Sequence, residues 1–447
     1  MSIPTRAILR GSLSALLLVI GFVAGWVGNA LYGDRFPIAS LVPALGPGLV
    51  ANQGTPPELR QRFSVFWEVW NLVESQHYQR RTLDRQRMIW GAIRGMLATL
   101  NDQYTVYQEP ELAAQTNEHM QGRQGGIGTY LRITDGRAYL WKPFKNGPAV
   151  AAGLAQDDEI LAVDGQEIGP LIAGLDTNEA AVKVAAMIRG QPGTEVTLRI
   201  RRAATGEVIE LTITRADVVV PSVESRMFPQ GIAYIRISEF KVNTTREFDD
   251  ALRELLPQNP KGMILDLRNN PGGFLQNAQE VLGRLYEGTA LFEENGEGTL
   301  TELRTISGDR SLRAFDLPLV VLVNGGSASA SEIVAGALRD SRDDVFLLGE
   351  KTFGKGSVQN IYTLSDGGSA RITFAHWLTP SKEQIHQVGI VPQYVVPYAE
   401  DKDTPAPCVA DRQPAPGSTT CPDNQLYYAI QLLVTGTPPP ATSAAAR

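Results

Sequence analysis

Apolar residues recur every three or four positions in two stretches of the chain, and this spacing predicts two amphipathic helices that pack together. The first stretch has Phe63, Phe66, Trp67, Trp70, Leu72 and Val73, and the second has Met88, Trp90, Ile93, Met96, Leu97 and Leu100. The aromatic residues would also suit a binding surface, but an apolar helix face more often forms a core. We therefore expect a helical region at residues 58–118.

The pattern then changes to short apolar strands separated by glycines. The predicted elements of this stretch are strands at 138–140, 159–163 and 196–200 and a helix at 179–188. This combination indicates a β-rich module, which we place at residues 119–217.

Strands and helices alternate in the next part of the chain. The predicted strands cover 232–237, 263–267 and 319–323, and the predicted helices cover 245–256 and begin at Asn277 and Ser331. Alternation of this kind indicates an α/β core with a partly parallel sheet, which we assign to residues 218–399. The Pro-rich tail at 400–447 is expected to be mostly irregular, with a candidate short helix at 425–434.

The N-terminus bears on the cellular compartment. Residues 11–33 carry no charge and follow two arginines, a pattern typical of a single membrane-spanning helix with its positive end in the cytoplasm. The alternative is a secretory signal cleaved at the small residues 28–30. We therefore interpret 1–35 as a membrane anchor or signal segment of a bacterial cell, with the body outside the cytoplasm, and 36–57 as a linker.

The composition of the chain limits the classes of molecule that it is expected to bind. The 447 residues have a formal net charge of -7, and no basic cluster is present to neutralise phosphates, so nucleic acid is not an expected partner. The two cysteines, Cys408 and Cys421, lie in the Pro-rich tail, where a catalytic or metal-binding role is not expected. Outside the cytoplasm they would form a disulfide, which we favour, and inside it they would be free thiols.

The most informative segment follows the apolar strand at 319–323, where two glycines precede Ser-Ala-Ser-Ala-Ser-Glu at 327–332. A strand-to-helix turn can expose a nucleophilic serine, and the free amides and dipole of the helix N-terminus favour developing negative charge. The alternative is that these serines only cap the helix.

A serine nucleophile needs a base, and none of the four histidines (His77, His119, His376, His386) lies in a recognisable pairing motif. A lysine can replace histidine where its surroundings lower its pKa. Lys355 lies between two glycines in Phe-Gly-Lys-Gly-Ser-Val-Gln, and Gln359 of the same segment could orient the amine. The alternative is a solvated lysine in a glycine turn.

A third segment, Asp-Leu-Arg-Asn-Asn-Pro-Gly-Gly at 266–273, follows another apolar strand. Its last two residues, Gly272 and Gly273, could bring a bare backbone amide towards an oxyanion. The alternative is that they form only a tight turn.

The three segments occur in the same order in the carboxyl-terminal processing peptidases, and the chain resembles this family from about Phe63 to Pro392. The resemblance implies a serine endopeptidase that cleaves proteins near their C-termini through an acyl-enzyme, without a metal or cofactor. It implies Ser329 as nucleophile, Lys355 as general base and Gln359 as the residue that orients the lysine.

The same resemblance assigns the remaining parts of the site. The oxyanion donors would be the backbone amides of Ala330 and of the turn at Gly272 and Gly273. Ser327 and Ser331 would be neighbours without a catalytic role.

The β-rich module resembles the PDZ domain of this family through Gly-Gly-Ile-Gly at 125–128 and Val-Asp-Gly at 163–165. PDZ domains bind a peptide as an added strand and hold its terminal carboxylate with loop amides. The resemblance therefore implies that Gly126, Ile127 and Gly128 bind the tails of protein substrates with free C-termini. An activating partner protein and a homo-oligomer both stay open.

The chain departs from the family pattern at three places outside the proposed dyad. The loop at 340–344 is one residue longer, Gln393 stands where an aspartate is common, and Lys382 replaces a usual glycine. Two other functions also fit parts of the sequence. A non-catalytic PDZ adaptor would not need Ser329 and Lys355, and a penicillin-binding amidase would need a Ser-x-x-Lys spacing that is absent around Ser329.

Overall fold

The computed structural model describes residues 56–440 except 145, 410–411, 413 and 415–416. The predicted anchor or signal segment, and the linker up to residue 55, lie outside these residues. Within the described residues, no helix has the length and apolar content needed to cross a lipid bilayer.

The chain divides into two compact units, and the smaller one contains residues up to Leu83 together with Ile361–Gly367. Its described helices are α2 (Pro57–Arg60), α3 (Phe63–Gln76) and the 3-10 turn η2 (Arg80–Thr82). The predicted helix therefore forms, and within its own unit α3 buries none of its side chains; the helix expected to pack on it, at 88–100, belongs to the larger unit. Within the described part of this unit, no second layer covers its apolar positions.

The larger unit contains the β-rich module. Its sheet has the order β3-β4-β5-β7-β8, with β6 paired to β5. The elements are β3 (Tyr130–Thr134), β4 (Arg137–Trp141), α6 (Pro148–Ala151), β5 (Glu159–Val163), β6 (Gln166–Glu167), α7 (Ile168–Ile172), α8 (Thr177–Ile188), β7 (Glu195–Arg201) and β8 (Val208–Thr214). The three predicted strands and the helix at 179–188 are confirmed, and the sequence missed the two short helices α6 and α7.

The α/β core is built on a six-stranded sheet of order β10-β11-β12-β15-β16-β19. Its strands are β10 (Val223–Met227), β11 (Ile232–Ile237), β12 (Gly262–Asp266), β15 (Leu319–Val323), β16 (Val345–Gly349) and β19 (Tyr394–Val395). All neighbours are parallel except the antiparallel pair β10 and β11. The predicted α/β class with a partly parallel sheet is therefore confirmed.

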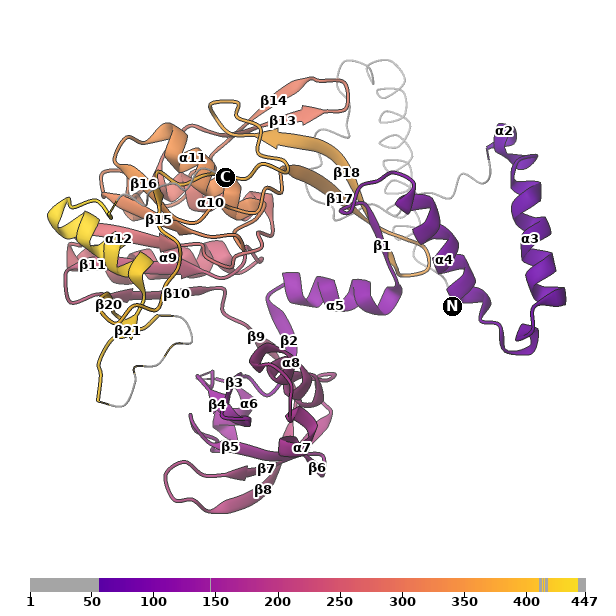
Figure 1. The fold of residues 1–447 in the computed structure, drawn as a ribbon, viewed down its shortest axis with the longest axis horizontal. Helices are drawn as coiled ribbons and strands as arrows, with labels where there is room; N and C mark the ends of the chain where they lie inside the picture. The colour runs from indigo at the N-terminus through magenta and orange to yellow at the C-terminus, as the bar shows by residue number, and fades with distance from the viewer. Residues whose placement is uncertain (1–55, 145, 410–411, 413, 415–416, 441–447) are drawn as a thin grey trace, which may run out of the picture. The chain divides into compact units, whose positions relative to one another are not determined.

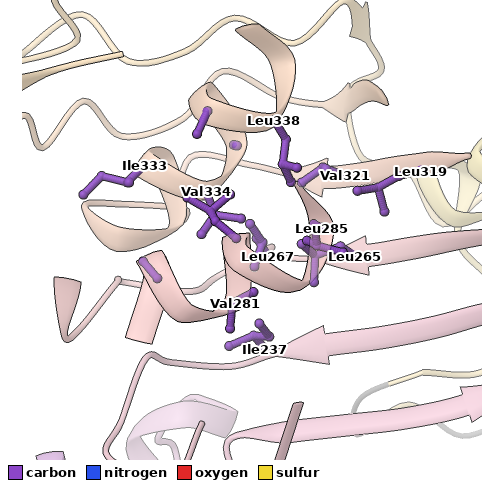
Figure 2. Close-up of a cluster of buried hydrophobic side chains, with 14 of the residues drawn as sticks. Ile237, Leu265, Leu267, Val281, Leu285, Leu319, Val321, Ile333, Val334 and Leu338 are labelled. Atoms are coloured by element: carbon purple, nitrogen blue, oxygen red, sulfur yellow. The ribbon is translucent and has the colours of Figure 1, made fainter. Parts of the chain in front are cut away.

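Side chains of the central strands alternate between two apolar layers. Ile235 and Val321 join the layer formed with α9 (Thr244–Leu255), α10 (Leu275–Leu285) and α11 (Ala330–Ser341). Figure 2 shows apolar side chains of α10 and α11 gathered with those of the strands in this layer. Tyr234 and Leu322 belong to the other layer, which α12 (Asn424–Thr435) shares. The sheet thus has a helical layer on each face, as Figure 1 shows.

The C-terminal segment is more ordered than its composition suggests. The predicted helix at 425–434 forms as α12, and its Leu426 and Ala429 are fully buried. Cys408 and Cys421 are joined by a disulfide beside the short ladder of β20 (Pro405–Ala406) and β21 (Cys421–Pro422). The composition of 400–447 did not indicate that the apolar face of this helix covers the sheet.

A second, antiparallel sheet carries part of the site. Its order is β1-β18-β13-β14, with β17 paired to β18. The strands are β1 (Val106–Gln108), β13 (Thr289–Asn295), β14 (Leu300–Arg304), β17 (Ser357–Thr363) and β18 (Ser369–Leu378), and the helices α4 (Arg85–Ala98) and α5 (Pro110–Met120) flank β1 in the chain. Pairing of β1 with β18 brings the residues just before β1 close to residues of β18.

Candidate active site

The predicted site lies at the carboxyl ends of two adjacent parallel strands, β12 and β15. Loops at this edge of an α/β sheet commonly form binding sites. The loop after β12 bonds to the loop after β15, because the Asn269 amide donates to Asn324 Oδ1 at 2.9 Å and the Ala328 amide donates to the Asn270 carbonyl at 2.9 Å. The structure therefore joins the predicted Gly-Gly turn to the predicted serine turn.

The three serines of the turn have different surroundings. Ser327 is fully buried and its hydroxyl donates to the Leu267 carbonyl at 2.8 Å. Ser331 is also fully buried, and its hydroxyl donates to the Asn270 carbonyl at 2.9 Å. Ser329 is only partly buried. Its two neighbours therefore tie the loops together, while Ser329 is the serine that faces accessible space.

Ser329 also has an unusual backbone. Its φ of 56° and ψ of -115° place it in a region that residues with a Cβ rarely occupy. It is the N-cap of α11, so the amide of Ala330 occupies the first helical position, where no preceding turn supplies a carbonyl. A strained residue at a helix N-terminus suits a nucleophile that must present its hydroxyl next to a free amide.

The glycine turn approaches this serine closely. A Cβ placed on Gly272 would lie 2.7 Å from Ser329 Cβ and 2.9 Å from the Ala330 nitrogen, and its φ of +102° also favours glycine. The Gly272 amide itself donates to Asn270 Oδ1 at 2.9 Å. Gly273 forms an isolated parallel β-bridge with Phe240, in which the Phe240 amide donates to the Gly272 carbonyl and the Phe274 amide donates to the Phe240 carbonyl. The N–H of Gly273 itself takes no part in this bridge.

Lys355 lies in the loop between β16 and β17 and is partly buried. Its Nζ lies 5.1 Å from the centre of the Tyr104 ring. Burial lowers the pKa of this amine, and the charge of Arg371 lowers it further, whereas Glu332 and Asp102 raise it. A larger neutral fraction is what a lysine general base requires.

Gln359 does not reach Lys355 in this structure. Its Nε2 donates to Ser357 Oγ at 2.9 Å and to Thr373 Oγ1 at 3.0 Å. Across the described part of the chain, no hydrogen bond joins the Lys355 amine to either Gln359 or Ser329. The structure thus brings the loops of the three residues together without the side-chain contacts of a reacting site.

Glu332 is a residue of the site to which sequence reasoning gave no role. It is fully buried, and its Oε2 accepts from the Ser329 amide at 2.8 Å and from the Lys355 amide at 2.9 Å. Its Oε1 accepts from Thr352 Oγ1 at 2.6 Å and from the Gly354 amide at 2.7 Å. The available signal was the Ser-x-x-Glu spacing of a helix capping box, followed by an otherwise small and apolar helix.

Tyr104 is a second residue that the sequence did not connect with the site. Asp102 holds its segment by accepting from the Tyr104 amide at 2.9 Å and from Thr105 Oγ1 at 2.7 Å. Behind the tyrosine, the His386 ring lies 6.3 Å from the Tyr104 ring and stacks on His376 at 4.6 Å between ring centres. Burial lowers the pKa of His386, which favours its neutral form.

The predicted tail-binding residues line a groove of the β-rich module. The groove has a volume of about 260 Å³ and lies between β3 and α8, with Gly126, Ile127 and Gly128 along it. The loop is held by the Ala149 amide, which donates to the Ile127 carbonyl at 2.8 Å. Ile188 and Leu131 add apolar lining, so the groove suits an extended peptide with an apolar side chain.

Three segments of the chain match known protein families. Residues 231–396 match peptidase family S41, residues 125–214 match a PDZ domain and residues 50–112 match the N-terminal domain of the activating protease CtpB. These three matches cover the helical region, the groove-bearing module and the α/β core.

Individual relatives agree with these matches. The chain is 39% identical over 336 residues to a carboxyl-terminal-processing protease of Synechocystis sp., which covers 73% of this chain and 75% of that protein. It is 34% identical to the carboxy-terminal processing protease CtpB of Bacillus subtilis, over 74% of this chain and 66% of that protein. A solved photosystem II D1 C-terminal processing protease is 29% identical, covering 77% of this chain and 94% of that chain with a TM-score of 0.43. The chain therefore belongs to the carboxy-terminal processing proteases, serine peptidases of family S41.

Proposed function

We propose that this protease hydrolyses protein substrates near their C-termini with Ser329 as nucleophile and Lys355 as general base. The observation that carries the proposal is that Oε2 of the buried Glu332 accepts from the backbone amides of both residues. The lowered pKa of Lys355 supports its role as base. Ser327 and Ser331 are unsuited to the role, because both are fully buried and bonded to backbone carbonyls.

The proposed reaction proceeds through an acyl-enzyme. The neutral Lys355 amine takes the proton of Ser329 Oγ while Oγ forms a bond to the scissile carbonyl carbon. The resulting oxyanion would accept from the Ala330 amide and from the glycine turn, and the lysine then gives its proton to the leaving amine as the C–N bond breaks. In the second half of the reaction, water attacks the ester carbonyl while Lys355 takes its proton. Lys355 then returns this proton to Ser329 Oγ as the bond between Oγ and the acyl group breaks.

The proposed chemistry requires movement of one side chain. In the described residues the Lys355 amine lies over the Tyr104 ring and has no hydrogen bond to Ser329. Catalytic hydrogen bonds are often incomplete before substrate binds, so Nζ must turn from the ring towards Oγ during the reaction. Gln359 would orient the amine after a similar adjustment.

Recognition of the substrate tail is proposed for the groove between β3 and α8. The peptide would extend the sheet along β3, and its carboxylate would accept from the loop amides at Gly126, Ile127 and Gly128. The rival function is a PDZ adaptor without activity, and the buried, connected loops around Ser329 disfavour it.

The membrane location is also a proposal. The uncharged stretch at 11–33, preceded by arginines, favours a single-pass anchor that leaves the protease body outside the cytoplasm. Cleavage of a signal segment at 28–30 is the alternative, and it would produce a secreted protein. The disulfide between Cys408 and Cys421 fits either oxidising location.

The test of the proposed dyad compares three variants of the purified protein. Ser329→Ala and Lys355→Ala are expected to lower peptide cleavage at least about 1,000-fold, because each removes a group that acts as part of one unit. Lys351→Ala is the matched control, since Lys351 is an exposed lysine of the same loop, and it should retain full activity. Cleavage is followed by mass spectrometry, and a serine-directed acylating probe reports the nucleophile. Undiminished cleavage by Ser329→Ala would refute the assignment.

A further inference from the structure

We infer that Glu332 is a positioning residue whose carboxylate sets the separation of nucleophile and base by binding the backbone amides of both. The inference rests on the proposed roles of Ser329 and Lys355. It goes beyond them because the Glu332 carboxylate bonds to the backbone amides of the two residues and not to their side chains, so it would act only through the two loops that it joins.

The Glu332 carboxylate is buried, whereas the carboxylate of a helix capping box commonly lies at the protein surface. Glu332 is fully buried. Among the described residues, no lysine, arginine or histidine forms an ion pair with it. A buried unpaired carboxylate is costly unless hydrogen bonds satisfy both of its oxygens. Here four donors do so, and an ordinary cap at the protein surface would not require this burial.

Each oxygen has a separate structural task. Oε2 joins the Ser329 amide at 2.8 Å to the Lys355 amide at 2.9 Å, so these two residues share one acceptor atom. Oε1 joins Thr352 Oγ1 and the Gly354 amide, which fixes the loop that leads to the lysine. The planar carboxylate therefore transmits the position of the α11 N-terminus directly to the backbone of Lys355.

The same group holds a backbone that would otherwise relax. Ser329 has a φ of 56°, and strain of this kind persists only where neighbouring contacts over-determine it. The Glu332 bond to its amide is one such contact, and the close approach of Gly272 is another. On the other side, Gly354 has a φ of +93°, so its loop also departs from regular structure.

The charge of Glu332 gives a second and independent readout. The groups that face the Lys355 amine are Glu332 from α11, Asp102 and Tyr104 from before β1, and Arg371 from β18, with His386 behind the tyrosine. Among these, Glu332 raises the pKa of Lys355. Activity requires the neutral amine, so the acid limb of kcat/KM follows this pKa. Removing the charge lowers the pKa and moves the limb to lower pH.

The experiment measures kcat, KM and the pH profile of Glu332→Gln, Glu332→Asp and wild type on one peptide substrate. Glutamine has the same shape but presents an NH2 group to two of the four donors, so kcat should fall about 100-fold, the loss expected from a small misplacement of reacting groups. KM should change little, and the acid limb should move to lower pH. Glu350→Gln is the matched control, because Glu350 also accepts a backbone amide, from Tyr398 at 2.9 Å, but bonds to neither loop residue.

Glu332→Asp keeps the charge and shortens the reach, so it should lose kcat without moving the acid limb. It also serves if the glutamine variant does not fold. A kcat within threefold of wild type in either folded variant, or an unmoved acid limb in Glu332→Gln, would overturn the inference. Ser329→Ala and Lys355→Ala separate the two proposals: if Lys355→Ala stays active the dyad itself is wrong, whereas inactive dyad variants beside an unaffected Glu332→Gln refute only the role of Glu332.

Discussion

At the scale of single residues, the site depends on a backbone conformation that the side chain of Ser329 makes unfavourable. A non-glycine residue in such a region stores about 1–3 kcal/mol. The contacts that hold it include the bond from its amide to the Glu332 carboxylate and the packing of Gly272 against its Cβ. Because both contacts also shape the space next to the Ala330 amide, the strain and the proposed oxyanion site have the same structural origin.

This strain leads to a prediction about stability. Ser329→Gly and Ser329→Ala both remove the hydroxyl, but only glycine adopts a φ of 56° without cost. Glycine also makes the unfolded chain more flexible, and this lowers the free energy of unfolding by about 0.4–1 kcal/mol, which offsets part of the gain from relieved strain. The glycine variant should therefore be more stable than the alanine variant by about 1 kcal/mol, measured by chemical denaturation of the two variants. An alanine variant as stable as the glycine variant would show that the strain in the turn is no larger than this offset.

At the scale of elements, the C-terminal segment supports the loop that carries the glycine turn. Arg268, at the start of that loop, is bonded to Asp266 at 2.7 Å and to Asp423, next to α12, at 3.1 Å. These charges are buried, so removing one partner would leave the others unsatisfied. Asp423 lies two residues after Cys421, so the disulfide and this ion-pair network fix the same stretch of chain.

Loss of the disulfide should therefore destabilise the core. The two cysteines are 13 residues apart, and closing a loop of this size contributes about 3 kcal/mol. For a domain of this size we expect the unfolding midpoint of the Cys408→Ser, Cys421→Ser double variant to fall by about 6–12 °C. Reductant should lower the midpoint of the wild type to that of the variant and leave the variant unchanged. Equal midpoints for oxidised wild type and variant would contradict this role.

The elements also show what sequence could and could not predict. The strands at 232–237 and 319–323 were predicted with the observed bounds, because each is a compact apolar run next to glycine or proline. The C-terminal helix was predicted, but its burial was not, since Pro-rich flanks conceal an apolar face that pairs with the sheet. For α3 the sequence predicted the helix itself, and the described part of its own unit contains no layer that covers its apolar face.

The candidate site could be proposed from the sequence where its residues lie in local motifs. Ser329, Lys355 and the glycine turn each stand in a short recognisable segment. The positions of Tyr104 and Gln359 depend on the pairing of β1 and β17 with β18. The pairing of β1 with β18 joins segments more than 200 residues apart, so a local sequence pattern does not reveal it. Glu332 stood inside the motif, and its four donors became apparent only when the loops were in place.

At the scale of the whole molecule, the PDZ module is an insertion whose two ends meet. Its first strand, β2 (Arg123–Gly126), pairs antiparallel with its last, β9 (Ala216–Val219). The chain therefore enters and leaves the module at one place, which is typical of an independently folded domain. We therefore expect that mutations can alter the proposed recognition of a substrate tail separately from hydrolysis of the peptide bond.

This separation gives the last prediction. Ala185 on α8 lines the groove, so Ala185→Trp should fill the space that a substrate side chain would occupy. Wild type should cleave a peptide with a free C-terminus better than its amidated counterpart, because loop amides bind a carboxylate. Ala185→Trp should lose that preference through a higher KM for the free peptide, while cleavage of the amidated peptide stays near the wild-type value.

Ala186→Trp is the matched control, because Ala186 is the next residue of the same helix, is exposed and does not line the groove. It should keep the wild-type preference. Products are identified by mass and KM is measured for both peptides with all three proteins. Equal cleavage of free and amidated peptides by the wild type would exclude tail recognition, and an unchanged preference in Ala185→Trp would place that recognition outside this groove.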